Sequence, residues 1–169
     1  NGMNSRIRAM GELPHAHALR QQGRGAKQRA LNNLPELLEQ FESNLTAKGA
    51  YVLWAEDAAE ANRLILDIAR QHEVKKVVKG KSMITEEIGL NPVLEGAGLH
   101  VVETDLGEFI VQLDHDTPSH IVAPIIHKTR EQVRDLFVSQ LAMTPSDDPA
   151  VMTAHARTHL RREFLSAEM

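Results

Sequence analysis

The chain has 169 residues, with 19 Lys and Arg against 23 Asp and Glu, which gives a formal net charge of -4. This length fits one ordinary domain, and the charge balance argues against a strongly basic nucleic-acid-binding module. There is no cysteine, which excludes disulfides, thiolate metal sites, a cysteine nucleophile and an iron–sulfur cluster held by this chain. No apolar run reaches the roughly 18 residues of a membrane span and no signal-peptide pattern is present, so we expect a cytoplasmic protein.

The N-terminal region divides into a polar arm and the start of an ordered domain. Residues 1–25 are polar and basic, and we expect a flexible or helical N-terminal arm there, followed by one α/β domain over 26–169. Apolar residues recur at helical spacing over 34–45, and Gly49 ends the run where a left-handed cap is expected. The apolar residues 51–54 then predict a short strand.

From residue 57 onward, predicted helices and strands alternate. Asp57 and Glu60 form a pair like a capping box before a helix that reaches about residue 73. Strands are predicted at 74–78, 100–103 and 120–123, and helices at 85–90, 91–96, 106–113, 129–141 and 150–166. Asn91 is the expected N-cap of the second of these helices, and Thr129 with Gln132 is a capping box. The alternation is typical of an α/β fold with a parallel-rich sheet flanked by helices.

The segment Gly80-Lys81-Ser82 follows the strand predicted at 74–78. Ligands of open α/β sheets bind at the carboxyl ends of the strands. A flexible backbone, a cation and a hydroxyl resemble part of a phosphate-binding loop, but Lys75 stands where the full motif needs glycine. The simpler interpretation makes Ser82 the N-cap of the next helix and leaves Lys81 able to contact an anion or a carboxylate.

Three carboxylates, Glu103, Asp105 and Glu108, follow the strand predicted at 100–103. Grouped carboxylates at a strand end can serve as acid, base or nucleophile when burial separates their pKa values. The alternative is that Asp105 caps the next helix and Glu108 faces water, because helix starts favour acidic residues.

Nine histidines are present. His155 and His159 lie one helical turn apart, but no third ligand at a known spacing accompanies them, so surface or half-buried helix positions are the better interpretation. His115, His120 and His127 lie in predicted loops and are better placed for a site. Their alternative role is to satisfy local backbone groups. One Trp, one Tyr and four Phe leave few platforms for stacking single-stranded nucleic acid.

Four separate blocks carry a more specific signal. They are KSMITEEIGLN at 81–91, ETDLGE at 103–108, PSHIVAP at 118–124 and HKTR at 127–130. Their order and spacing closely resemble those of the lactate-utilisation family, in particular its iron–sulfur subunit, and the similarity extends from about Ala18 to the C-terminus.

The resemblance implies a fold like that of the sugar-phosphate isomerases and CoA transferases, and a role in oxidising L-lactate to pyruvate in the cytoplasm. Longer family members hold two four-iron four-sulfur clusters on cysteines beyond the matched region, and they work with two sister subunits. On this resemblance we expect an N-terminal fragment that is inactive alone. We also expect an incomplete sheet, through whose open edge a homodimer can form.

Position and chemistry, and not the resemblance, select the candidate site residues. We expect His120 and His127 to handle protons near neutral pH, and Lys81 to hold a carboxylate. The candidate ligand-binding residues are Lys81, Ser82, Glu86, Glu87, Asn91, Glu103, Thr104, Asp105 and Glu108. No metal ligand is selected.

Two other functions stay open. The domain can be a docking module, in which the polar blocks orient sister subunits and no substrate is transformed. It can also be an isolated enzyme like the isomerases or CoA transferases. A shared fold does not imply that activity, and no glutamate stands in a Ser-Glu-Asn-Gly context of the CoA-transferase type.

Overall fold

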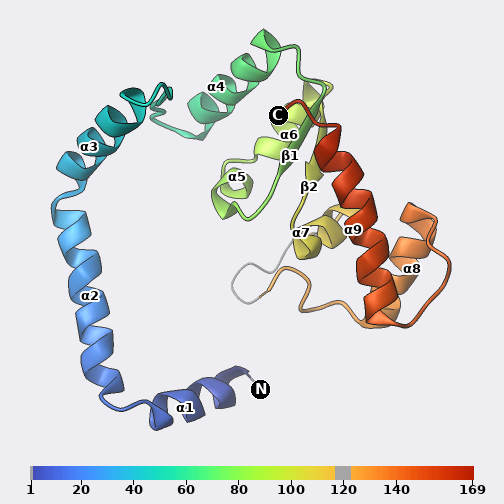
Figure 1. The fold of residues 1–169 in the computed structure, drawn as a ribbon, viewed down its shortest axis with the longest axis horizontal. Helices are drawn as coiled ribbons and strands as arrows, with labels where there is room; N and C mark the ends of the chain where they lie inside the picture. The colour runs from blue at the N-terminus through green and yellow to red at the C-terminus, as the bar shows by residue number, and fades with distance from the viewer. Residues whose placement is uncertain (1, 117–122) are drawn as a thin grey trace. The chain divides into compact units, whose positions relative to one another are not determined.

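The computed structural model describes residues 2–116 and 123–169, which separate into two compact units with the boundary between Leu53 and Trp54 (Figure 1). The first unit holds α1 (Gly2–Glu12), α2 (Ala16–Asn32) and α3 (Leu34–Thr46). The second unit holds α4 (Ala58–Gln71), β1 (Lys76–Lys79), α5 (Met83–Glu87), α6 (Leu90–Gly96), β2 (His100–Glu103), α7 (Leu106–Leu113), α8 (Arg130–Leu141) and α9 (Pro149–Leu165). None of the described helices combines the length and the apolar character that crossing a membrane requires.

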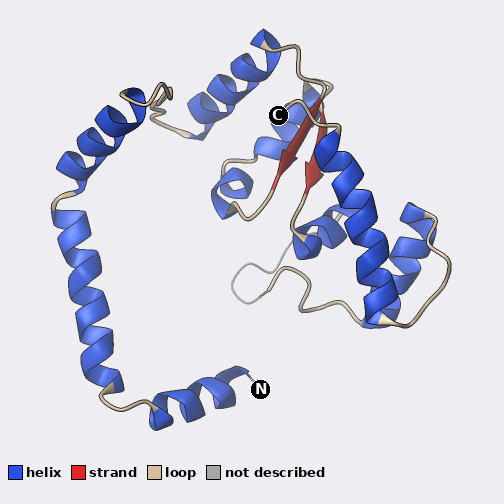
Figure 2. Cartoon of the chain, viewed as in Figure 1, coloured by secondary structure: helices blue, strands red, loops and turns tan. Residues whose placement is uncertain are grey.

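The regular structure of the first unit is helical throughout (Figure 2). Packing among its three helices buries none of their residues, as suits a helical arm. The predicted division between residues 25 and 26 stays a prediction. The strand predicted at 51–54 is wrong: these residues belong to no helix or strand, and Tyr51 is 95% exposed. A short apolar run does not hold an extended conformation without a neighbouring strand bonded to it.

A parallel pair of strands forms the centre of the second unit. The register pairs Lys76 with His100, Val77 with Val101, Val78 with Val102 and Lys79 with Glu103. Both strands form close to where the sequence predicted them, because β-branched valines pack well on a pleated surface. The α/β fold class, with parallel strands flanked by helices, is confirmed (Figure 2).

Two apolar clusters hold the helices of this unit together. One joins the two strands to α6 and to partly buried residues of α4, and its buried members are Val77, Leu90, Leu94 and Val101. The other joins α7, α8 and α9, and its buried members are Ile110, Phe137, Met143, Met152 and Ala156. The carboxyl ends of β1 and β2 lie beside both groups of helices, which supply the surroundings of the site.

Both outer edges of the strand pair carry hydrogen bonds. Beside β2, the Gln112 carboxamide accepts from the Glu103 N–H at 2.9 Å and donates to the Val101 carbonyl at 2.8 Å. Beside β1, the Val78 N–H donates to the Met169 carbonyl at 2.8 Å, and the Met169 N–H donates to the Lys76 carbonyl at 3.3 Å. This second pair of bonds has the pattern of one parallel ladder rung. Homodimer formation through the sheet stays a prediction.

Side-chain caps begin several helices as predicted. The Ser82 Oγ accepts from the Thr85 N–H at 3.4 Å at the start of α5. Thr129 and Gln132 complete both bonds of a capping box at α8. At α4, Asp57 accepts from the Glu60 N–H, while the Glu60 carboxylate accepts from the N–H of residue 56 instead of that of the N-cap.

Two predictions around α6 and the last strand need correction or restriction. Asn91 is not the N-cap of α6; Gly89 occupies that position with a φ of 65°. Glycine adopts this left-handed conformation without steric cost, and the N-cap lies two residues earlier than predicted. Of the strand predicted at 120–123, residues 120–122 lie outside the described residues and Ala123 belongs to no strand.

Candidate functional site

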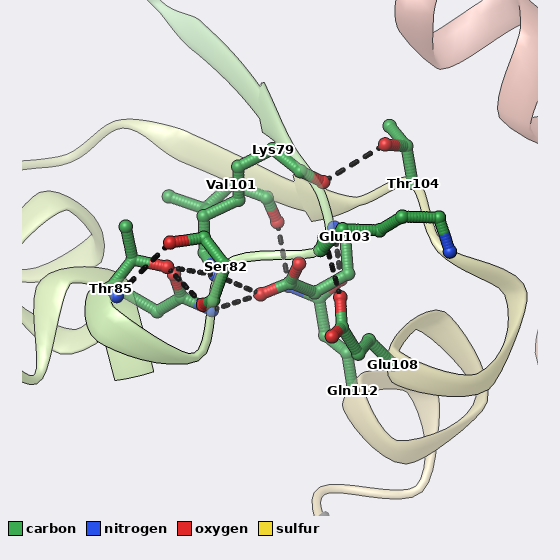
Figure 3. A network of polar contacts seen from close by, with 10 residues as sticks. Lys79, Ser82, Thr85, Val101, Glu103, Thr104, Glu108 and Gln112 are labelled. Atoms are coloured by element: carbon green, nitrogen blue, oxygen red, sulfur yellow. Dashed lines mark hydrogen bonds and ion pairs between the residues drawn. The ribbon is translucent and has the colours of Figure 1, made fainter. Parts of the chain in front are cut away.

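Lys79 and Glu103 meet where the two parallel strands end. They occupy the same register position, and the Lys79 ammonium forms an ion pair with Glu103 Oε1. The same ammonium donates to Thr85 Oγ1 at 3.0 Å (Figure 3). The two side chains are only 10% and 4% exposed. Two charges taken out of water in this way require each other, because removing either one leaves the other buried and uncompensated.

Glu103 is also the centre of an amide network. Asn91 Nδ2 donates to Glu103 Oε1 at 3.1 Å, and the Glu103 N–H donates to Gln112 (Figure 3). Two buried oxygens of the network, Glu103 Oε2 and Asn91 Oδ1, have no hydrogen-bond partner among the described residues. A buried acceptor without a donor costs about 1–3 kcal/mol. The network therefore has more acceptors than donors.

Lys81 lies on the solvent side of this network. Its ammonium pairs with Asp105 and its side chain is 81% exposed. The hydrogen bond from Asp105 raises the pKa of Lys81, and the same bond lowers the pKa of Asp105. Asp105 Oδ1 also accepts from the Gly107 N–H at 3.0 Å and so caps α7, as predicted. At neutral pH the pair is fully charged, and Lys81 is a cation that an incoming carboxylate can reach.

Glu108 differs from the expectation that it faces water. It is 8% exposed, and its Oε2 accepts from the Lys81 N–H at 3.2 Å. That backbone bond fixes the turn after β1, where Lys81 has a φ of 58°. Left-handed backbone at a non-glycine residue is uncommon and needs such support.

Gly80 allows the two strand ends to approach each other. Thr104 donates to the Lys79 carbonyl through both its N–H, at 2.7 Å, and its Oγ1, at 3.0 Å. A Cβ added at Gly80 would lie 2.7 Å from Thr104 Oγ1. The glycine of the segment 80–82 is thus explained by close packing at this point, and the hydroxyl of Ser82 by capping.

A cavity of about 710 Å³ lies beside the network. Its walls come from α5, α6, α7 and the loop residues next to them. Five of the candidate ligand-binding residues line it: Glu86, Glu87, Asn91, Glu103 and Glu108. Thr104 instead lines a separate cavity of about 390 Å³ together with residues of α9, among them Arg157 and Arg161. Lys81, Ser82 and Asp105 line neither of these cavities.

The two histidines proposed for proton handling have different outcomes. His127 Nε2 lies 2.8 Å from Asp116 Oδ2, and Asp116 lines the large cavity. Lys128 donates to the same Asp116 oxygen at 2.7 Å and also bonds Asp114, and these bonds raise the pKa of Lys128. His127 therefore contacts a residue of the cavity lining without lining the cavity itself. His120 lies outside the described residues.

The helical histidines His155 and His159 are half-buried, as expected, and each has a partner. His155 Nε2 lies 3.1 Å from the Leu141 carbonyl, and the His159 ring stacks on Phe109 with centroids 5.5 Å apart. Over residues 2–116 and 123–169, no three His, Asp or Glu side chains gather in a way suited to a metal ion.

Comparison with known proteins places these features in a family. Residues 38–169 match the LUD domain. The chain belongs to the LUD domain family. It is 46% identical over 169 residues to the lactate utilization protein B of Geobacillus kaustophilus (strain HTA426), which covers 99% of this chain and 36% of that protein. It is 46% identical over 165 residues to the lactate utilization protein B of Bacillus velezensis, which covers 97% of this chain and 35% of that protein. The chain spans about a third of the length of these curated relatives, and no solved structure matches it.

The matched LUD region contains all of the network and both cavities described above. Sequence reasoning had selected most of the carboxylates in it. The candidate site residues do not include Lys79, Gln112 and Glu95, which belong to the network or line the large cavity. A signal for Lys79 was available: it lies two residues after the apolar Val77, so both side chains lie on the same face of β1.

Proposed function

We propose that this LUD domain is part of a lactate-utilisation protein that takes part in oxidising L-lactate to pyruvate in the cytoplasm. The observation that carries the proposal is the 46% identity, sustained over 99% of the chain, to proteins named lactate utilization protein B. The blocks at 81–91 and 103–108, which resemble that family, also supply most of the polar network at the strand ends.

The chain's own share in such a reaction is binding and positioning. It contains no cysteine, so its residues do not fit an iron–sulfur cluster. Under this proposal the two four-iron four-sulfur clusters belong to the rest of a longer protein, sister subunits are the partners, and the 169-residue chain alone does not oxidise lactate. Redox chemistry belongs to such cofactors, while protein groups supply orientation and electrostatics.

The geometry offers one cation and one proton-handling group for this role. Lys81 is exposed and charged, and it is held by a single carboxylate, Asp105. A substrate carboxylate can take the place of Asp105 as its partner. His127 lies beside Asp116, and histidine is the side chain that most often serves as a general acid or base.

Growth on defined carbon sources tests the proposal. Deleting the gene that encodes this chain in its source organism is expected to abolish growth on L-lactate and to leave growth on pyruvate unchanged. Pyruvate is the matched control, because it enters metabolism after the proposed step. Undiminished growth on L-lactate by the deletion strain would overturn the proposal.

A docking role is the second candidate, and exposed apolar side chains favour it. On α5, Met83 is 47% exposed and Ile84 is 69% exposed, two and three residues after Lys81. Exposed apolar residues beside a charged one are typical of interface patches.

One pair of measurements separates the two roles. Lys81→Ala and His120→Ala are placed in the full-length protein, and both complex assembly and lactate-dependent electron transfer are measured. Loss of activity with assembly intact supports a substrate site, and loss of assembly supports an interface. If both survive, Lys81 and His120 have neither role.

A further inference from the structure

The smaller cavity, of about 390 Å³, lies where β2 ends. Its walls join two residues that follow β2, Thr104 and Leu106, to one face of α9. Ligands of open α/β sheets bind outside the carboxyl ends of the strands. The volume of the cavity also falls within the range of small-molecule sites. Its position and its size therefore make this cavity a candidate binding site.

Two arginines of α9 supply the charge of this cavity. Arg157 and Arg161 both line it, and both are exposed. Residues four positions apart are neighbours on a helix surface, so the two guanidinium groups can act on one ligand. None of the described residues that line the cavity is acidic. Within residues 2–116 and 123–169, neither guanidinium has an ion pair or a hydrogen bond. An anion from outside the chain can therefore reach both without displacing a carboxylate.

The arginines of two other helices in the same unit differ in this respect. Each arginine of α4 and α8 forms an ion pair with a carboxylate; these arginines are Arg63, Arg70, Arg130 and Arg134. The chain has 23 Asp and Glu against 19 Lys and Arg, so carboxylate partners are plentiful. Guanidinium groups bind carboxylate and phosphate through two parallel N–H···O bonds. Two such groups in one cavity, both without a carboxylate, favour a ligand with an oxyanion head.

The other walls of the cavity are largely apolar. Leu106 and Leu160 are half-buried, and Phe164 is 61% exposed. Apolar surface in contact with water gains free energy when a ligand covers it. L-lactate, whose apolar part is one methyl group, would leave most of these walls uncovered. The ligand that fits the cavity therefore has a larger apolar body beside its oxyanion head.

We propose that the smaller cavity binds an organic anion with a carboxylate or phosphate head and an apolar body. Arg157 and Arg161 hold the oxygens of the head, and the Thr153 hydroxyl can donate to one of them. The body packs on Leu106 and Phe164. The site goes beyond the proposed function, since its ligand is larger than lactate, and it stands whether or not the chain serves lactate oxidation.

Calorimetric titration of the purified chain tests the site, at one ionic strength throughout because salt screens exposed charges. The probes are 3-phenylpropanoate and phenyl phosphate. Sodium L-lactate and inorganic phosphate are the matched small anions, which carry the same heads without a large apolar body. We expect saturable binding of at least one aromatic anion, about tenfold or more tighter than that of its matched small anion. The aromatic anion with the higher affinity identifies the head as a carboxylate or a phosphate.

Variants of exposed side chains separate the head from the body. Arg157→Gln and Arg161→Gln each remove one charged donor and are expected to weaken binding of the aromatic anion about tenfold or more. Arg162→Gln is the matched control: it removes the same charge from an exposed position of α9 outside the cavity, and should leave binding unchanged. Phe164→Ala is expected to reduce the preference for the aromatic anion over its matched small anion severalfold. Circular dichroism confirms that each variant is folded.

Four outcomes would overturn the site. The first is the absence of saturable binding by both aromatic anions, which would leave the two arginines to an interface with protein. The second is equal affinity for the aromatic anions and their matched small anions. The third is a loss in Arg162→Gln as large as in the two cavity variants, which would indicate only general attraction of anions to α9. The fourth is an unchanged preference for the aromatic anion in Phe164→Ala, which would place the apolar body elsewhere.

Discussion

Lys79 and Glu103 are cross-strand partners at the last register position of β1 and β2, and they share a buried ion pair. Parallel strands place their carboxyl ends together, so a cation at the end of one and a carboxylate at the end of the other meet without any help from a loop. The pair positions Glu103 between Asn91 and Gln112. The rest of the site therefore depends on it.

Replacing Lys79 tests that dependence. Lys79→Met keeps the side-chain length but leaves Glu103 buried without its cation, and we expect a loss of about 3–5 kcal/mol in the free energy of unfolding. Urea denaturation measures it. Lys81→Met is the control, because Lys81 is exposed and ion pairs of exposed side chains contribute little to stability. Equal losses in the two variants would contradict the assignment of Lys79–Glu103 as a buried, interdependent pair.

Gln112 acts in place of a third strand beside β2. Its carboxamide makes the two bonds that a neighbouring backbone would make, to the Glu103 N–H and the Val101 carbonyl. Gln112→Ala removes both, and we expect a loss of about 1–3 kcal/mol and a new tendency to self-associate through the uncovered edge. Light scattering over a concentration series measures the association. Gln112→Glu keeps the acceptor but places a carboxylate against the Val101 carbonyl and beside Glu103 and Glu108, and we expect it to be at least as destabilising as Gln112→Ala.

Gly80 and Thr104 form a steric pair. Gly80→Ala places a Cβ 2.7 Å from Thr104 Oγ1, and we expect a loss of about 1–3 kcal/mol from this overpacking. Thr104→Ala removes the obstructing oxygen. In the double variant the alanine at position 80 should therefore cost much less than it does alone, as thermal denaturation of the four proteins of the cycle would show. If the losses of the two single variants were additive in the double variant, the contact between positions 80 and 104 would not be the source of the strain.

The stability contributed by Glu163 is expected to depend on pH. Its Oε2 lies 2.8 Å from the Lys76 ammonium, and that hydrogen bond is the main reason that the pKa of Glu163 is lowered; His159 and His100 add to the effect. A lowered folded-state pKa means that the contribution is complete above the ordinary Glu pKa of about 4.3. It is lost as the pH falls through the lower folded-state value.

Comparison with Glu163→Gln isolates this contribution. Above about pH 5 we expect the wild type to be more stable than the variant by about 1 kcal/mol, and we expect the difference to shrink toward zero as the pH falls below about 4. Urea midpoints of both proteins over this pH range measure it. A difference that grew on acidification would have the wrong sign for a carboxylate stabilised in its charged form.

The strands and most helix starts could be predicted because they depend on local sequence. The valines of β1 and β2 fix extended segments, and caps such as Ser82 and Asp105 act within three residues of themselves. The strand predicted at 51–54 failed because pairing depends on a partner that is distant in the sequence. The start of α6 was misplaced because the competing cap, Gly89, acts through backbone conformation and has no side-chain pattern.

The candidate site was likewise predicted only in part, because some of its contacts join residues that are distant in the sequence. Glu103 and Asp105 were selected from their position after a strand, and the structure gives both defined partners. The burial of Lys79 could not be inferred from residue type, since lysine is rarely buried unless it is paired. Its partner lies 24 positions further on, and only the register of two strands brings them together.

The bonds between Met169 and β1 have a practical consequence for the preparation of this protein. Glu168 also accepts from the Lys75 and Lys76 N–H groups, at 3.1 and 2.8 Å, so the last two residues bind the backbone of β1 at several points. Trimming these two residues would uncover donors along the strand that positions Lys79. An affinity tag fused directly after Met169 would disturb the same hydrogen bonds. Purification tags are therefore better placed at the N-terminus, since the described residues of the first unit form helices and no strand.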